Sequence, residues 1–98
     1  MILIITEPAE LDMQDILSDG YKKYGETKAI SYANSIYDKL RSLQGFPNMG
    51  HIRNDIPFGY KAIQVEKEHI AVYRVDGQTI YISRILYSGF DFNRHRIQ

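Results

Sequence analysis

The spacing of apolar residues changes once along this chain, and that change limits the folds that the chain can adopt. Between residues 9 and 44, apolar side chains recur every three or four positions, which is the period of an amphipathic helix. Between residues 60 and 87, short segments rich in Val, Ile and Tyr are typical of strands instead. Helices followed by strands predict an α+β fold in which the helices cover one face of a sheet.

A short strand and a helix are predicted at the start. Met1–Ile5 is apolar on both faces, so we expect a central strand, although a buried helix would show the same pattern. Thr6 is a good N-cap, and Pro8 fits the first turn of a helix that Gly25 ends. The polar residues, Asp12 among them, take the outer side of this helix. Its apolar stripe is Ala9, Met13, Ile16, Gly20 and Tyr24.

A second helix is predicted from about Thr27 to Gln44. Its stripe is Ala29, Ala33, Ile36, Leu40 and Leu43. The link after the first helix has only two or three residues, so the two helices must form an antiparallel hairpin. Gly20 should weaken the first helix by up to about 1 kcal/mol, unless a close helix neighbour needs the room.

Three strands are predicted in the second half. Residues 45–59 contain three glycines and two prolines and should form a loop. The strands are expected at Tyr60–Val65, His69–Val75 and Thr79–Tyr87, and Asp76-Gly77 is a strong hairpin signal between the last two. The predicted order is an N-terminal strand, the helical hairpin and a three-stranded antiparallel meander, in a single domain over residues 1–98.

Both faces of the predicted meander are apolar. Alternation places Ile70 and Val72 on one face of their strand and Ala71 and Tyr73 on the other. In the last strand, Ile80, Ile82, Arg84 and Leu86 should point one way, and Tyr81, Ser83, Ile85 and Tyr87 the other. The helices can cover one face only, so the other would stay exposed unless a tail or a partner covers it.

Composition and charge exclude several classes of function. The chain has no cysteine, which excludes disulfides, thiolate metal sites and a cysteine nucleophile. Its longest apolar run, Met1–Ile5, is far shorter than the roughly 20 residues of a spanning helix, so we expect a cytoplasmic protein without a membrane partner. The formal charge is zero, with −2 in residues 1–50 and +2 in residues 51–98, so direct nucleic-acid binding is not favoured.

The motifs of common enzymes are absent from the sequence. There is no phosphate-binding loop, no paired-histidine metal motif and no nucleophile elbow. The three histidines, His51, His69 and His95, are far apart in the sequence and have no carboxylate pattern around them. We therefore expect neither a metal nor another cofactor.

Basic and aromatic residues gather near the C-terminus. Arg84, Arg94, His95 and Arg96 surround Tyr87, Phe90 and Phe92. Such a pattern can grip single-stranded nucleic acid, but the favoured interpretation is that the phenylalanines anchor a C-terminal tail. Inside the strands, Arg74 and Arg84 should be half-exposed on the side that faces a partner, or bonded to a carboxylate such as Asp91. A structural pair is the favoured interpretation, and a contact with an anion or a partner is the alternative.

The order of several short motifs resembles that of ParE-type toxins of the ParE/RelE toxin-antitoxin superfamily. The motifs of the second half are Gly59-Tyr60-Lys61, His69 to Val75, Ile80 to Leu86, and Asp91. The first half agrees through Thr6, Ala9, Asp12, Ile16, Tyr24, Gly25, Pro47 and Gly50. The resemblance covers essentially the whole chain, and its strength lies in the order of the motifs.

The resemblance implies a toxin that a cognate antitoxin, ParD-like or other, wraps and covers. ParE-type toxins inhibit DNA gyrase, whereas the RelE branch cuts messenger RNA in the ribosome. The resemblance is compatible with a homodimer or with a hetero-oligomer that contains the antitoxin. The residues expected to contact partners are Tyr60, Lys61, Tyr73, Arg74, Arg84, Tyr87, Phe90, Asp91 and Phe92.

A ribonuclease is the alternative function. A metal-free ribonuclease needs clustered Lys and Arg side chains with a Tyr, His or Glu in reach. The residues that could supply this are Lys61, Arg74, Arg84, Tyr87 and His95. Because this set contains only one lysine and the chain has no net charge, we predict a non-catalytic toxin. Tyr87 stands where ParE-like sequences often have histidine and keeps the ribonuclease open, and a module that binds antitoxin but has lost its target is a third possibility.

Overall fold

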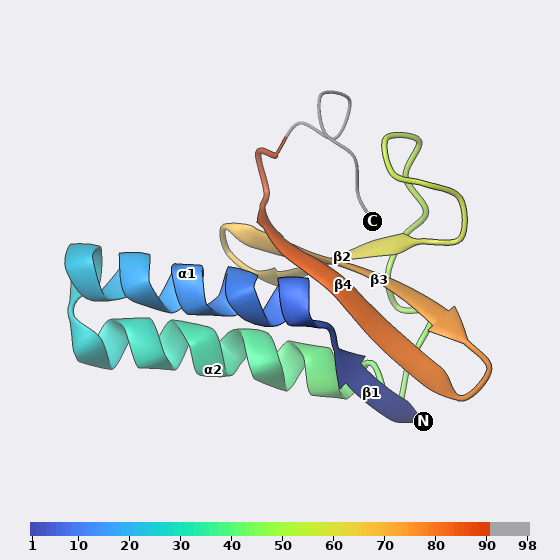
Figure 1. Ribbon diagram of the computed structural model, residues 1–98, viewed down its shortest axis with the longest axis horizontal. Helices are drawn as coiled ribbons and strands as arrows, with labels where there is room; N and C mark the ends of the chain where they lie inside the picture. The colour runs from blue at the N-terminus through green and yellow to red at the C-terminus, as the bar shows by residue number, and fades with distance from the viewer. Residues whose placement is uncertain (91–98) are drawn as a thin grey trace.

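The computed structural model describes residues 1–90, and its elements follow the predicted order (Figure 1). They are β1 (Ile2–Ile5), α1 (Glu7–Tyr24), α2 (Glu26–Ser42), β2 (Lys61–Glu66), β3 (His69–Asp76) and β4 (Thr79–Tyr87). The sheet has the order β1-β4-β3-β2, with β1 parallel to β4 and the other pairs antiparallel. The predicted α+β fold with its helical hairpin and antiparallel meander is confirmed.

Local sequence signals define the first helix and its junction with the second. The Thr6 hydroxyl accepts a hydrogen bond from the Ala9 amide at 3.4 Å, so Thr6 is the N-cap, and Pro8 lies in the first turn. Gly25 separates α1 from α2 with a φ of 85°, which favours glycine. Neither helix of the described residues is long and apolar enough to cross a membrane.

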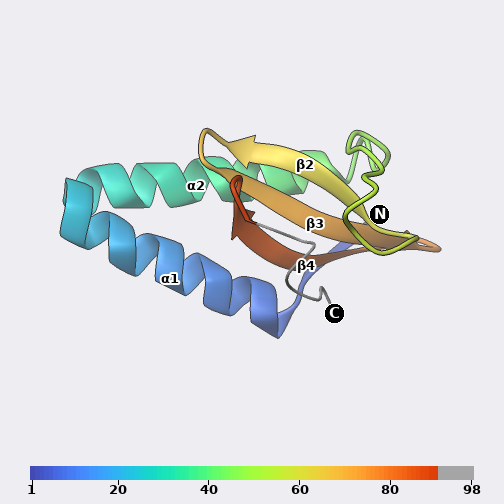
Figure 2. The same ribbon diagram turned by 90° about the horizontal axis from the view of Figure 1, so that it is seen from above.

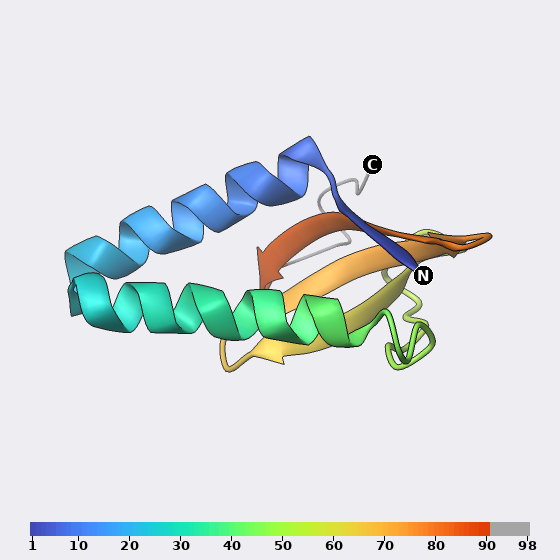
Figure 3. The same cartoon turned by 90° about the horizontal axis from the view of Figure 1, so that it is seen from below.

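The two helices meet closely near the tip of the hairpin and diverge toward the sheet (Figure 3). A Cβ atom at Gly20 would lie 3.0 Å from the Cβ of Ala29. Gly20 therefore makes room for a close helix neighbour, as the sequence suggested. At the diverging end, the Tyr37 hydroxyl donates to the Glu10 carboxylate at 3.4 Å and joins the helices across a wider gap.

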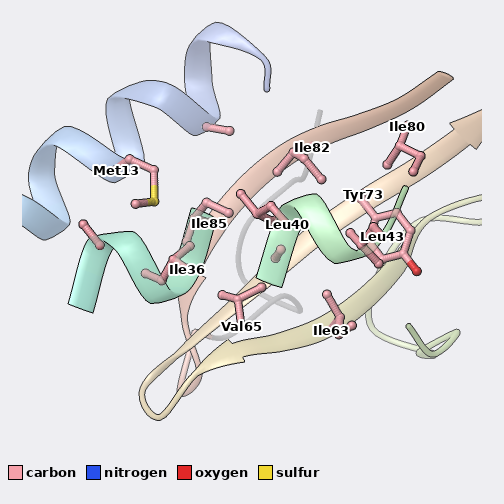
Figure 4. Packing of buried hydrophobic residues seen from close by; sticks show 13 residues of the cluster. Met13, Ile36, Leu40, Leu43, Ile63, Val65, Tyr73, Ile80, Ile82 and Ile85 are labelled. Carbon is pink, nitrogen blue, oxygen red and sulfur yellow. The ribbon is translucent and has the colours of Figure 1, made fainter. Parts of the chain in front are cut away.

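The main core lies between the helical hairpin and one face of the sheet (Figure 4). Seen from above, the helices run along this face while the loop of residues 45–59 lies at the far end of the sheet (Figure 2). The largest completely buried side chains are Tyr73, Ile36, Leu40, Leu43, Ile80, Ile82 and Val72. All but Val72 belong to this core, which therefore fixes the hairpin on the sheet.

The opposite face of the sheet is covered by the chain itself. Ile70, Val72 and Leu86 are buried there and pack with Ile56 from the loop and with partly buried Phe90. The sequence predicted that this face would stay exposed unless a tail or a partner covers it. The residues at the centre of this face are buried within the chain, so an uncovered sheet face gives no argument for a partner.

The position of β1 corrects a sequence prediction. β1 lies at an edge of the sheet and pairs with β4 alone, whereas a central strand was expected. Leu3 and Ile5 pack on the core, but Ile2 and Ile4 are 59% and 40% exposed. A short apolar run that contains no charge looks the same at an edge as in the centre, because nothing in it marks the exposed face.

A β-bulge in β4 corrects the predicted alternation of that strand. Val72 pairs with Arg84 but Tyr73 pairs with Ile82, so Ser83 is an extra residue on the β4 side. Ile82 and Ile85 consequently both reach the helix-side core, and Leu86 lies on the other face. The simple period of two placed Ile82 and Leu86 together and was wrong beyond the bulge.

Tyr73 is the largest completely buried side chain and fastens the loop to the sheet. Its hydroxyl donates to the Pro47 carbonyl at 2.8 Å and accepts from the Gly50 amide at 2.8 Å.

We expect Tyr73→Phe to lower the free energy of unfolding by about 2 kcal/mol, because it leaves both backbone groups without a partner. Urea unfolding measures this. Tyr21→Phe, at a tyrosine that is 42% exposed, should change it by less than about 0.5 kcal/mol, and an equal loss in both variants would contradict the account.

Candidate functional site

The tip of the helical hairpin extends beyond the sheet (Figures 1 and 3). Residues of this overhang and of the neighbouring end of the sheet line a pocket. The apolar stripe of α1 continues past the sheet: Ala9 and Met13 are buried in the core, but Tyr24 is 62% exposed. The pocket has a volume of about 470 Å³. Its lining comes from α1, α2, the β2–β3 turn and the end of β4. We call it the overhang pocket, and its lining residues are Ile16, Asp19, Gly20, Lys23, Tyr24, Lys28, Ala29, Tyr32, Lys67, Glu68, His69 and Tyr87.

Tyr32, His69 and Tyr87 form the best-defined group of side chains in the pocket. The Tyr32 hydroxyl lies 2.7 Å from Nδ1 of His69 and accepts a hydrogen bond from the Glu68 amide at 3.2 Å. The His69 ring also meets the rings of Tyr32 and Tyr87 edge to face, at centroid distances of 5.5 and 6.2 Å. These contacts hold the imidazole at the inner wall of the pocket.

The sequence prediction treated His69 as an isolated histidine and named neither Tyr32 nor Lys23, Lys28 or Lys67. These residues lie far apart in the sequence and are brought together only by the hairpin and the β2–β3 turn. One signal was available, because the apolar stripe of the first helix reaches Tyr24 while the predicted strands are too short to cover it. Tyr87 was predicted as a site residue, and it lies in the pocket.

Burial lowers the pKa of His69, partly opposed by the nearby Glu68 carboxylate. A histidine whose pKa is lower in the folded chain than in the unfolded chain binds its proton more weakly when folded. Its contribution to stability is therefore complete above a pH of about 6.5 and is lost as the pH falls through the unfolded pKa to the folded one. His69→Gln should remove this loss.

The measurement is urea unfolding of the wild type and of His69→Gln at pH 7.5 and pH 5.5. We expect the wild type to lose more free energy of unfolding between these two pH values than the variant does. A variant that loses as much as the wild type would show that His69 is not the group responsible. His51→Gln is the matched control, because it makes the same substitution at an exposed histidine outside the pocket lining.

Arg84 lies beside α1 and is bound to Asp12. Its Nε and Nη2 donate to the two carboxylate oxygens of Asp12 at 2.8 and 2.9 Å, and the Ile85 amide donates to the same carboxylate at 2.9 Å. This bidentate pairing raises the pKa of Arg84. The pairing of Arg84 with a carboxylate, which the sequence favoured, is confirmed, but the described partner is Asp12. Asp91, the partner suggested from the sequence, lies outside the described residues.

Asp12 completes the edge of β4 where β1 ends. The Thr6 amide and hydroxyl both donate to the Ile82 carbonyl, and the hydroxyl also lies 3.2 Å from the Ser83 carbonyl. Two residues after Ser83, the Ile85 amide donates a hydrogen bond to the Asp12 carboxylate. Asp12 was predicted on the solvent side of the helix, because a charged residue outside the apolar stripe is usually exposed. Its side chain is in fact only 14% exposed.

Arg74 lies on the opposite face of the sheet from the helices. Its guanidinium lies over the ring of Tyr81, 4.2 Å from the centroid, and 3.7 Å from the Asp76 carboxylate. The Arg74 side chain is 39% exposed, in agreement with the expected half-exposed position. It is separated from the overhang pocket by the sheet itself.

The other residues of the predicted partner set are scattered. Tyr73 is completely buried, so its side chain is not available to a partner and it leaves the set. Tyr60 and Phe90 are partly buried against the second face of the sheet, and Lys61 opens β2 opposite Tyr73. Asp91, Phe92 and His95, which were also predicted as site residues, lie outside the described residues.

The predicted ribonuclease set is not brought together in the described residues. Lys61 pairs with Tyr73 and Tyr87 pairs with His69, which puts Lys61 and Tyr87 roughly 15 Å apart by strand geometry. Arg74 lies on the other face, and Arg84 is bound to Asp12. No single position reaches all four side chains.

The comparison with protein families decides the relationship of this chain. Residues 3–92 match the model of the family described as ParE toxin of type II toxin-antitoxin system, parDE. The chain belongs to the ParE toxin family. The resemblance seen in the sequence is thereby confirmed. The hydrogen bonds that join α1 to β4 through Thr6 and Asp12, and the loop to the sheet through Tyr73, are therefore parts of a ParE fold.

Solved structures agree with membership of the ParE family. A structure described as the chromosomal ParDE TA system from P. aeruginosa is 28% identical, has a TM-score of 0.80, and matches over 89% of this chain and 95% of that chain. A YoeB/ParE toxin from Agrobacterium tumefaciens is 20% identical with a TM-score of 0.58, over 89% of this chain and 98% of that one, which bears on the fold alone. No curated protein matches the sequence. As a ParE toxin of a parDE-type system, the chain has a cognate antitoxin as its partner.

Proposed function

We propose that this ParE-family toxin stops growth by binding DNA gyrase in the cytoplasm, without cutting RNA, and that its antitoxin neutralises it by binding. The observation that carries the proposal is the match to the ParE family over residues 3–92. The gyrase target follows from the ParE-type resemblance rather than from a contact in the fold.

The positions of the basic residues support a non-catalytic action. An arginine that stabilises a developing negative charge must be free to bond the reacting group. Arg84 instead gives Nε and Nη2 to Asp12, and Lys61 and Tyr87 lie at opposite ends of the strands. The neutral overall charge also suits a protein target better than a ribosomal RNA surface.

A supercoiling assay tests this proposal. Purified toxin is titrated into gyrase with relaxed plasmid and ATP, and the expected result is loss of supercoiling that an equimolar amount of antitoxin reverses. Because the inhibitor acts by binding, its midpoint should follow the gyrase concentration when binding is tight. Full gyrase activity at a large excess of folded toxin would contradict the proposal.

The overhang pocket keeps one alternative function in view. It places His69 and Tyr87 in edge contact, with Lys23, Lys28 and Lys67 along its rim, and these are residue types that a metal-free ribonuclease uses. Primer extension on translated messages tests the alternative. A ribonuclease would produce cuts that vanish in Tyr87→Phe and in His69→Gln. Intact messages during growth arrest would rule out this function.

A further inference from the structure

We propose that the overhang pocket binds an acidic segment of the antitoxin, and that one aromatic or branched apolar side chain of this segment fills the pocket. The inference rests on the proposed function, which supplies the antitoxin as partner. It adds the place on the toxin and the chemistry of the segment that binds there.

The shape of the hairpin supports an apolar anchor. The end of α1 leaves an aromatic side chain of the pocket lining uncovered, since Tyr24 is 62% exposed. Beneath it, Ile16, Gly20 and Ala29 provide apolar lining close to the helix crossing. A pocket of about 470 Å³ is within the size range of pockets that enclose a ligand group. Tyrosine-rich concave surfaces of this kind are typical of binding hot spots.

The rim of the pocket supports an acidic ligand. Lys23, Lys28 and Lys67 line the pocket from three elements, α1, α2 and the β2–β3 turn. None of these lysines forms an ion pair within residues 1–90. Asp19 and Glu68 offset part of this charge, and three positive against two negative side chains leave +1 at a pocket of a neutral chain.

His69 provides a polar anchor at the inner wall. The Tyr32 hydroxyl accepts from the Glu68 amide and lies 2.7 Å from Nδ1 of His69, so its own hydrogen is free to point to Nδ1. We assign the neutral Nε2–H tautomer on that basis, which leaves Nε2–H as a hydrogen-bond donor. A carboxylate or a backbone carbonyl of the bound segment is a suitable acceptor.

The mixed rim favours a peptide over a nucleic acid. A polyphosphate chain would bring repeated negative charge against Asp19 and Glu68, and a net charge of +1 gives little attraction for it. A peptide can place its carboxylates opposite the lysines and leave the two acidic side chains in water. Its single apolar side chain then uses the lining that phosphates would leave empty.

Charge reversals with a matched control test the proposal. The test variant is Lys28→Glu with Lys67→Glu, and the control is Lys22→Glu with Lys39→Glu, which changes the net charge by the same amount at lysines outside the pocket lining. Affinity for the purified cognate antitoxin is measured by titration calorimetry at low and moderate salt. We expect roughly tenfold or greater weakening in the test variant and less than about twofold in the control. Urea unfolding checks that both variants are folded.

A second pair of variants tests the apolar anchor. Tyr24→Ala should weaken antitoxin binding several-fold, whereas Tyr21→Ala, at an exposed tyrosine of the same helix outside the lining, should not. Overlapping peptides of the antitoxin then locate the segment, which should be net acidic and lose binding when its apolar residue is replaced by alanine.

The outcomes separate this inference from the proposed function. Equal affinity of both charge variants, or a pocket segment that is basic, would overturn the inference while the toxin-antitoxin pair stands. A single-stranded oligonucleotide that binds the wild type and is lost in the Lys28/Lys67 variant would overturn it in favour of a nucleic acid. Antitoxin that does not bind the wild type at all would instead contradict the proposed function.

Discussion

Asp12→Ala should lower the free energy of unfolding by about 3 kcal/mol. The substitution leaves the Arg84 guanidinium without its bidentate partner and the Ile85 amide without an acceptor at the edge of β4. We take the low end of the values for broken buried pairs, because the Arg84 side chain keeps 32% of its exposure and is partly hydrated. For a chain of 98 residues this is a large share of the total stability.

Urea unfolding and a thermal melt measure this effect. The expected fall in Tm is roughly 12 °C or more for a domain of this size. Asp15→Ala, at an exposed aspartate of the same helix, should stay within about 0.5 kcal/mol of the wild type. Asp12→Asn keeps an oxygen for the Ile85 amide and should lie between the two. If Asp12→Ala costs no more than Asp15→Ala, the joint between α1 and β4 does not hold the fold as described.

Leu40→Ala should also cost about 3 kcal/mol. Leu40 is completely buried between α2 and the sheet, among Ile36, Leu43 and Ile82, and its truncation removes apolar contacts and leaves a cavity (Figure 4). Because this core fixes the hairpin on the sheet, the substitution also loosens the wall of the overhang pocket.

The matched control is Leu11→Ala, which removes the same atoms from a leucine that is 51% exposed on α1. Its expected loss is below about 1 kcal/mol. Free energies of unfolding from urea titrations at pH 7.5 compare the two variants directly. A Leu11→Ala loss as large as that of Leu40→Ala would mean that the exposed face of α1 is packed in a way that the fold does not show.

Much of the fold could be predicted from the sequence because its signals are local. Thr6, Pro8 and Gly25 define the first helix, and Asp76-Gly77 defines the last hairpin, each through the conformation that its own residues prefer. The edge position of β1 and the bulge at Ser83 were missed. Both depend on which strands pair, and an apolar run carries no mark of that choice.

The candidate site was predicted only in small part. Tyr87 and Arg84 were named from their places on the last strand, but the partner of Arg84 is Asp12, 72 residues away in the sequence. His69 was set aside because nothing near it in sequence suggested a partner, whereas Tyr32 on α2 supplies one. Long-range pairs of this kind arise from the fold and leave no periodic signal.

The residues that carry the family resemblance hold the fold together. Thr6 and Asp12 fasten α1 to β4, and Tyr73 fastens the loop through Pro47 and Gly50. The Asp12 and Tyr73 side chains are turned into the fold by these bonds, so we look for contacts with a target among exposed residues, such as those of the overhang pocket.

Plasmid topology and message integrity, measured together in cells within minutes of induction, test the central claim most directly. If the toxin inhibits gyrase, plasmids lose negative supercoiling while translated messages stay intact, and co-expressed antitoxin restores normal topology. Messages cut at defined positions while plasmid supercoiling stays normal would contradict gyrase inhibition and identify the toxin as a ribosome-dependent messenger-RNA endoribonuclease instead.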